Sequence, residues 1–275
     1  MSVSKDLACE FLSPNQYAIG LSSGMDIITQ QTMQAHTTRY LPTPENSNPT
    51  PSCAILILDL KNMFNSVSMV KSREIIHSQF PHLLPLFDVL YYEDTKCWYR
   101  QPDGRRNFIL RKESSSQGCP FAAFLACLVL DDIIKKIDNE LHVRATSRKN
   151  TNCISDDGLG TRAIVMSYID GTTVSIGFED LKIFLDRCNE LGTPLGCVLK
   201  PQKCQIMTST NGSSPIPNLN IQHQHDLMYS LNKYCGGQIN GEIITGTRIL
   251  GTPIGNKQFA EHFQNKKNSK TSYSY

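Results

Sequence analysis

Two aspartates in this chain follow apolar segments, in positions where a carboxylate could bind a metal ion. Asp59 ends the run Ile55-Leu-Ile-Leu-Asp59, whose apolar and β-branched residues predict a buried strand. Asp170 ends Val165-Met-Ser-Tyr-Ile-Asp170, and Gly171 follows it, a pairing that favours a hairpin turn. A carboxylate at a buried strand end needs a cation, and two carboxylates on neighbouring strands suffice to hold Mg²⁺. Metal-assisted catalysis is then the expected chemistry. The alternatives are a Lys or Arg partner for Asp59 and a plain turn at Asp170.

Further segments follow in a fixed order. Phe64 stands five residues after Asp59, and the others are Ser114–Pro120 with Gln117-Gly118, Leu195–Gln205 and Ile249–Gly255. Together with the two aspartate segments, this series resembles motifs A to E of the reverse transcriptases, from residue 55 to residue 255. Motif A, which reads Asp-x-x-Asn-x-Phe from Asp59, resembles that of non-LTR retroelements. Upstream, Gln16–Met25 loosely resembles the Gln- and Gly-containing segment that precedes motif A.

The resemblance implies RNA-directed DNA synthesis from dNTPs, with an RNA template, a DNA primer and two Mg²⁺ ions for which Mn²⁺ could substitute. Asp59 and Asp170 would be the catalytic metal ligands. Lys203 matches the catalytic lysine of motif D, near the leaving pyrophosphate. Lys200 is close enough to be the real match, and a solvated lysine is an equal alternative.

The same resemblance implies a nucleotide site. Phe64 would stack on the sugar and exclude a 2′-hydroxyl, although a core phenylalanine is its alternative. Gln117 and Gly118 would approach the incoming nucleotide, with Tyr168 from motif C beside them. Gly251 lies in the motif E hairpin, which would grip the primer, although a Gly/Pro turn explains that segment nearly as well.

Motif C departs from the family. Where Tyr-x-Asp-Asp is usual, this chain has Tyr168-Ile-Asp-Gly171, so the second carboxylate is missing and we expect impaired catalysis. The rival acidic pairs, Asp156-Asp157 and Asp131-Asp132, are expected to be solvated. Three functions therefore stay open: a reverse transcriptase, an impaired remnant that binds nucleic acid, and an RNA-templated RNA polymerase, against which Phe64 argues.

Basic and aromatic residues alternate between Cys97 and Leu110, which reads as a hairpin turning at Asp103-Gly104. Arg100, Arg105 and Arg106 are the predicted phosphate contacts, and neighbouring rings could stack on bases. A plain solvated hairpin face is the alternative.

Composition predicts a globular protein. The 275 residues are 40% hydrophobic and 19% charged, and the net charge of +2 does not announce a nucleic-acid binder. Ten cysteines without a Cys-x-x-Cys pair indicate a reduced, intracellular protein, with nucleus and cytoplasm both open. No membrane partner is expected, because the longest apolar stretch, Phe121–Leu130, is about half the length of a membrane span.

The elements alternate irregularly, which predicts an α+β polymerase palm, an antiparallel sheet packed on helices with partial fingers. Residues 1–52 would be the partial fingers and a loop, 53–258 the palm, and 259–275 a disordered tail. The predicted helices are Val67–Phe80 capped by Ser66, Leu83–Tyr92, Pro120–Leu141 and Phe178–Leu191; the predicted loops are His142–Thr161 and Asn211–His225.

Overall fold

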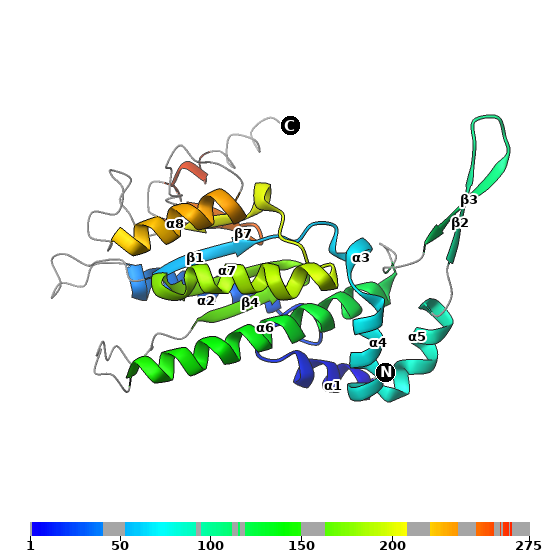
Figure 1. Ribbon diagram of the computed structural model, residues 1–275, viewed down its shortest axis with the longest axis horizontal. Helices are drawn as coiled ribbons and strands as arrows, with labels where there is room; N and C mark the ends of the chain where they lie inside the picture. The colour runs from blue at the N-terminus through cyan, green and yellow to red at the C-terminus, as the bar shows by residue number, and fades with distance from the viewer. Residues whose placement is uncertain are drawn as a thin grey trace.

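The protein is described by a computed structural model that combines helices with antiparallel sheets (Figure 1). It describes residues 2–40, 53–91, 95–111, 115, 119–149, 163–207, 221–235, 246–255, 259, 261–263 and 265. The α+β class predicted from the sequence, an antiparallel sheet packed on helices, is confirmed.

The central sheet has four strands in the order β4-β5-β1-β6. These are β1 (Cys53–Leu58), β4 (Ile164–Tyr168), β5 (Gly171–Gly177) and β6 (Gln205–Met207). All three pairings are antiparallel, and β1 runs beside β5 from Cys53↔Gly177 to Leu58↔Thr172. The end of β1 and the start of β5 therefore lie at the same end of the sheet.

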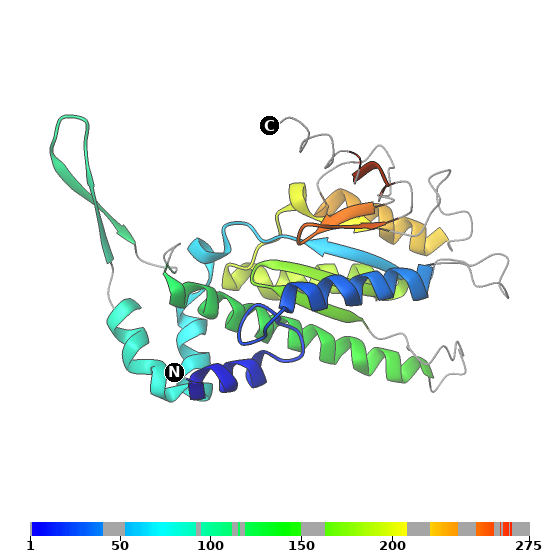
Figure 2. The same ribbon diagram turned by 180° about the vertical axis from the view of Figure 1, so that it is seen from behind.

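Each face of this sheet packs against a different layer. The helices α6 (Pro120–Lys149) and α7 (Phe178–Gly192) cover one face, where Leu56 and Val174 join the main core (Figure 1). On the other face lie α2 (Gly24–Tyr40) and the hairpin of β7 (Gly246–Ile249) and β8 (Thr252–Gly255), where Ile55 packs in a smaller core (Figure 2). The alternation of strand side chains thus gives each face its own apolar contacts.

The remaining elements surround these layers. They are α1 (Ser2–Leu12), α3 (Met63–Ser66), α4 (Met69–Gln79), η1 (Pro81–Leu83), α5 (Leu84–Tyr91), β2 (Thr95–Arg100), β3 (Arg106–Arg111), η2 (Thr193–Leu195), η3 (Pro201–Lys203) and α8 (Ile221–Tyr234). The β2–β3 hairpin projects away from the rest of the molecule (Figures 1 and 2). None of the helices in the described part of the chain is long and apolar enough to cross a membrane.

Three helix boundaries differ from the sequence predictions. Residues 142–149, predicted as loop, continue α6, because Leu141 and Ala145 keep an apolar side buried. Residues 221–225, also predicted as loop, begin α8. The side chain of Ser68, not that of Ser66, caps α4 by accepting a hydrogen bond from the Lys71 N–H.

Two further sequence predictions concern the cysteines and the C-terminal residues. Eight cysteines of the described residues are free thiols, and one of them, Cys97, is exposed. Burial raises the pKa of the Cys127 thiol to about 12, which keeps it protonated and unreactive. Beyond residue 258, the described positions 259, 261–263 and 265 are helical, so the predicted tail includes ordered helix.

Ser66 has another role, because it joins α3 to the segment that follows α7. Its hydroxyl donates to the carbonyl of Gly196 at 2.7 Å. Gly196 has a φ of +78°, and a Cβ added there would lie 1.6 Å from the Ser66 carbonyl oxygen. Only glycine allows this close approach of two backbones.

We expect Gly196→Ala to lower the free energy of unfolding by about 3 kcal/mol or more, because the added carbon overlaps backbone atoms. Gly104→Ala is the matched control: its φ is +85°, but nothing lies within 4 Å of the added carbon. That control should cost only about 1 kcal/mol of left-handed strain. Urea unfolding of both variants measures the difference, and equal losses would show that the contact with Ser66 is unimportant.

Asp131 is also a correction, because the sequence predicted a solvated residue and the structure buries it. It is 1% exposed on α6, and Lys135 Nζ lies 2.7 Å from its Oδ2. Burial raises its pKa from 3.8 to about 6, although Lys135 opposes the shift. The apolar face of α6 continues through this position and packs inward, so the Asp131 carboxyl is buried together with that face.

Since the folded protein holds this proton more tightly than the unfolded chain, Asp131 contributes stability that is complete below about pH 3.8 and is lost as the pH rises through about 6. Asp131→Asn removes that titration. The free energy of unfolding of the variant, relative to wild type, should therefore rise between about pH 4 and pH 7, by up to about 3 kcal/mol. Urea unfolding across this range tests the prediction; parallel pH profiles would contradict it.

Candidate active site

The sheet register brings the backbones of the two predicted metal ligands to the same end of the sheet. Asp59 comes directly after β1, whose last residue pairs with Thr172. Asp170 occupies the two-residue turn between β4 and β5, where Tyr168 pairs with Gly171. Continuing the β1–β5 register by one residue sets Asp59 opposite Gly171, so the two aspartate backbones are separated by roughly 6 Å. Both side chains are partly exposed to solvent.

A second segment borders Asp59 on the side away from β5. The Lys200 N–H donates to the Asp59 carbonyl at 2.8 Å, and Leu60 forms an antiparallel bridge with Leu199. From this segment Lys203 extends its Nζ to 3.2 Å from Asp59 Oδ2. The predicted Lys or Arg alternative for Asp59 is therefore present, and it is the predicted motif D lysine that supplies it.

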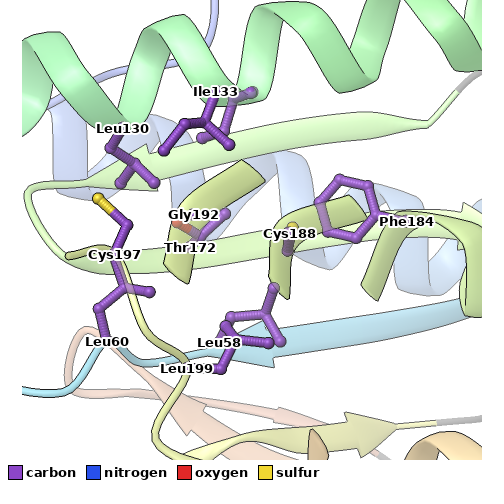
Figure 3. A pocket seen from close by; sticks show the side chains of 11 residues that line it. Leu58, Leu60, Leu130, Ile133, Thr172, Phe184, Cys188, Gly192, Cys197 and Leu199 are labelled. Carbon is purple, nitrogen blue, oxygen red and sulfur yellow. The ribbon is translucent and has the colours of Figure 1, made fainter. Parts of the chain in front are cut away.

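Apolar packing supports the backbone on either side of Asp59. Leu58 and Leu60 line a small cavity between α6, α7 and the sheet, together with Cys197 and Leu199 (Figure 3). Since strand side chains alternate, Asp59 belongs to the opposite side from Leu58 and Leu60. The strand end is thus anchored in the core while its carboxylate stays accessible.

The β4–β5 turn leaves space beside Asp170. A Cβ added at Gly171 would meet only the Tyr168 carbonyl oxygen, at 3.7 Å, an ordinary contact. Burial, the charge of Asp131 and the charge of Asp170, in that order, raise the pKa of the Cys127 thiol. Tyr168 is half-buried against the smaller core, and no contact tests its predicted nucleotide role.

Phe64 lies in α3, just beyond Asp59, and is half-buried against the main core. The Ser115 hydroxyl donates to its carbonyl at 2.7 Å, which brings the motif B segment beside it. Gln117 and Gly118 lie outside the described residues, and the roles predicted for them stay predictions. This packing is compatible with both predicted roles of Phe64, a core side chain and a partly exposed ring at the nucleotide site.

The predicted basic hairpin forms as β2 and β3. Trp98 pairs with Phe108, with ring centroids 5.2 Å apart, and Arg100 pairs with Arg106. Lys96 Nζ lies 5.2 Å from the centroid of Phe108. One face of the hairpin thus carries three cations around two exposed rings. Two arginines directly opposite each other repel unless an anion lies between them.

Arg105, the third predicted phosphate contact, lies in the loop of this hairpin. Its side chain is 83% exposed, and its Nε lies 3.4 Å from Asp103 Oδ2. Such an exposed pair is weak and leaves the guanidinium able to contact another anion.

The predicted motif E hairpin forms as β7 and β8. Its two turn residues, Leu250 and Gly251, have φ values of 46° and 94°, as a type I′ turn requires. The hairpin packs through Ile249 and Ile254 on the sheet face that also contacts α2. Its predicted contact with a primer stays a prediction.

The donor atoms at the sheet end suit a hard cation. Among the described residues, no three His, Cys, Asp or Glu side chains gather into a metal site. Asp59 and Asp170 would therefore be the protein ligands, with water and phosphate oxygens completing the shell, as Mg²⁺ commonly accepts. The rival pair Asp156-Asp157 lies outside the described residues, and Asp131 is enclosed with Lys135.

Gln16 is a residue whose role was not predicted from the sequence: its side chain reaches the backbone of the β4–β5 turn. The sequence around Gln16 has no strand periodicity and reads as a loop. No sequence signal could have indicated this long-range contact; only the loose resemblance of the surrounding segment drew attention to it.

The fold resembles that of solved telomerases. The TM-score is 0.53 to a telomerase from Candida Tropicalis in complex with a fragment of telomeric RNA, at 13% identity over 77% of this chain and 34% of that chain. For an apo telomerase from Candida Tropicalis truncated from its C-terminal domain, it is 0.52, at 14% identity over 78% and 41%. The chain therefore spans well under half the length of these proteins. No curated protein matches the sequence.

A family model described as reverse transcriptase (RNA-dependent DNA polymerase) matches residues 7–252. The chain belongs to the reverse transcriptase family, and the resemblance drawn from its five motifs is confirmed.

The ion pair between Lys203 and Asp59 makes a direct prediction. The ammonium group competes with a divalent cation for the carboxylate, so Lys203→Met should tighten Mn²⁺ binding about threefold, the scale of an exposed ion pair. Lys200→Met is the matched control, because Lys200 contacts Asp59 through its backbone N–H. Titration with Mn²⁺, followed by electron paramagnetic resonance, measures both affinities. Equal affinities in both variants would mean that Lys203 does not compete at this site.

Proposed function

We propose that this chain is the palm of a retroelement RNA-directed DNA polymerase, which transfers nucleotides from dNTPs to a primer 3′-hydroxyl on an RNA template. The observation that carries the proposal is the β1–β5 register, which sets Asp59 and the Asp170 turn at one end of the sheet. Family membership and the telomerase-like fold support the reaction class.

In this proposal Asp59 and Asp170 hold two Mg²⁺ ions, for which Mn²⁺ could substitute. The bound ions would activate the 3′-hydroxyl and stabilise charge on the reacting phosphate. Lys203, exposed and already at the Asp59 carboxylate, is placed to move toward the leaving pyrophosphate when Asp59 takes up a cation. Phe64, four residues before the α4 cap residue Ser68 and beside Ser115, would exclude the 2′-hydroxyl of an rNTP.

The hairpin of β2 and β3 supports a nucleic-acid partner. Arg100 and Arg106 face each other beside the exposed Trp98, which is 64% exposed. Phosphates between the two arginines would relieve their repulsion, and the ring could stack on a base. The hairpin also favours the second candidate function, a remnant that binds nucleic acid without efficient synthesis. Gly171, which replaces the usual second carboxylate of motif C, supports the same candidate.

Primer extension on a homopolymer RNA template, with a DNA primer and Mg²⁺ or Mn²⁺, tests the proposal. We expect slow synthesis by the wild type, faster with Mn²⁺, and at least a tenfold gain for Gly171→Asp, or about 1.4 kcal/mol of transition-state stabilisation. The structure accommodates that side chain, because only one atom lies near the added Cβ. Asp59→Asn should abolish synthesis in both backgrounds.

Asp88→Asn is the control, since Asp88 pairs with Arg73 on α4 rather than with the site. Synthesis that survives Asp59→Asn would contradict the proposed site. A wild type fully active with Mg²⁺ and unchanged by Gly171→Asp would show that the missing second carboxylate does not limit synthesis. Binding of the template without extension by any variant would support the nucleic-acid-binding remnant. The same assay with rNTPs examines Phe64: Phe64→Ala should admit them, and unchanged discrimination would assign the ring to the core.

A further inference from the structure

A short segment before α2 extends the central sheet beside the candidate site. The Ser167 N–H donates to the Asn15 carbonyl at 2.7 Å, and the Tyr17 N–H donates to the Ser167 carbonyl at 2.8 Å. Between these bonds Gln16 forms a parallel bridge with Ser167, on the outer edge of β4. The backbone on both sides of Gln16 is therefore fixed to the strand that leads into the Asp170 turn.

The Gln16 side chain continues this contact into the turn itself. Its Oε1 accepts a hydrogen bond from the Ile169 N–H at 3.0 Å, and its Nε2 donates to the Ile169 carbonyl at 3.4 Å. Oε1 also accepts from the Ala18 N–H at 3.2 Å, and Gln16 is only 2% exposed. One buried amide thus satisfies both backbone groups of Ile169.

Ile169 needs such support because its backbone conformation is unfavourable. Its φ is 58°, in the left-handed region, where a β-branched side chain is a genuine outlier. The turn has only two residues, Ile169 and Asp170, between the paired Tyr168 and Gly171. A left-handed first residue in such a turn is normally glycine. Strain of this kind persists when the surrounding structure imposes it.

We propose that Gln16 is a positioning residue: by holding both backbone groups of Ile169, it fixes the orientation in which the next residue, Asp170, presents its carboxylate to a divalent cation. The inference rests on the proposed function, because it assumes that Asp170 is a metal ligand. Gln16 itself contacts neither substrate nor ion; it acts through the Ile169 peptide groups.

Gln16→Met tests this role in the full chain. Methionine has nearly the same shape and is apolar, so it fills the same buried space but makes neither hydrogen bond to the turn. We expect Mn²⁺, titrated by electron paramagnetic resonance, to bind at least tenfold more weakly than to the wild type. Gln16→Asn, one methylene shorter with the same amide, should lose affinity to an intermediate degree and serves if the methionine variant fails to fold.

Leu141→Ala is the control for simple destabilisation. It removes a buried side chain from α6, about 15 Å along the helix from Asp131, and should lower the thermal midpoint without changing Mn²⁺ affinity. If Leu141→Ala weakens Mn²⁺ binding as much as Gln16→Met does, or if both Gln16 variants bind Mn²⁺ as the wild type does, the positioning role is overturned and the proposed function stands. A wild type that binds no Mn²⁺ overturns the metal site and the positioning role together.

Discussion

The antiparallel pairing of β1 with β5 is the interaction on which the rest of the site depends. It joins segments more than a hundred residues apart in the sequence, from Cys53↔Gly177 to Leu58↔Thr172. Because the period of a strand is two, a shift of this register by one residue would move Leu56 and Val174 out of the main core. Core packing therefore fixes the register, and the register in turn fixes which residues stand at the sheet end.

Charge at this end is balanced locally. Lys203 Nζ lies 3.2 Å from the Asp59 carboxylate and offsets its charge. The Lys200 N–H holds the Asp59 carbonyl, and Leu199 pairs with Leu60. The loop that carries these residues is anchored where Gly196 meets Ser66. A carboxylate paired with an exposed lysine can exchange that partner for a metal ion at little cost, which a fully buried ion pair could not.

The sequence predicted the strands and turns of this site well, since each is specified by local pattern. The apolar run before Asp59 predicted β1 correctly, and the Asp-Gly pair at residue 170 predicted a hairpin that forms, with its turn one residue earlier, on Ile169 and Asp170. What local pattern could not predict depends on distant packing. Asp131 looked solvated because its neighbour is charged, yet the continuing apolar face of α6 encloses it.

The same limit explains Ser66 and Gln16. Serine is a residue type that commonly caps helices, but the Ser66 hydroxyl instead donates a hydrogen bond to the carbonyl of Gly196, 130 residues away in the sequence. Gln16 stands 153 residues from Ile169, and its role follows only from the edge of β4. For Asp59 the sequence predicted the kind of partner, a Lys, an Arg or a metal ion. Only the fold shows that Lys203 is the residue that lies beside it.

We propose that Asp59 and Asp170 hold divalent cations together. Crystals of the chain grown with Mn²⁺ and an unreactive dNTP analogue, with anomalous scattering recorded at the manganese edge, test it most directly. We expect anomalous peaks within about 2.0–2.3 Å of carboxylate oxygens of both residues, with Lys203 displaced from Asp59. Peaks at only one carboxylate, or none while Lys203 still pairs with Asp59, would contradict it.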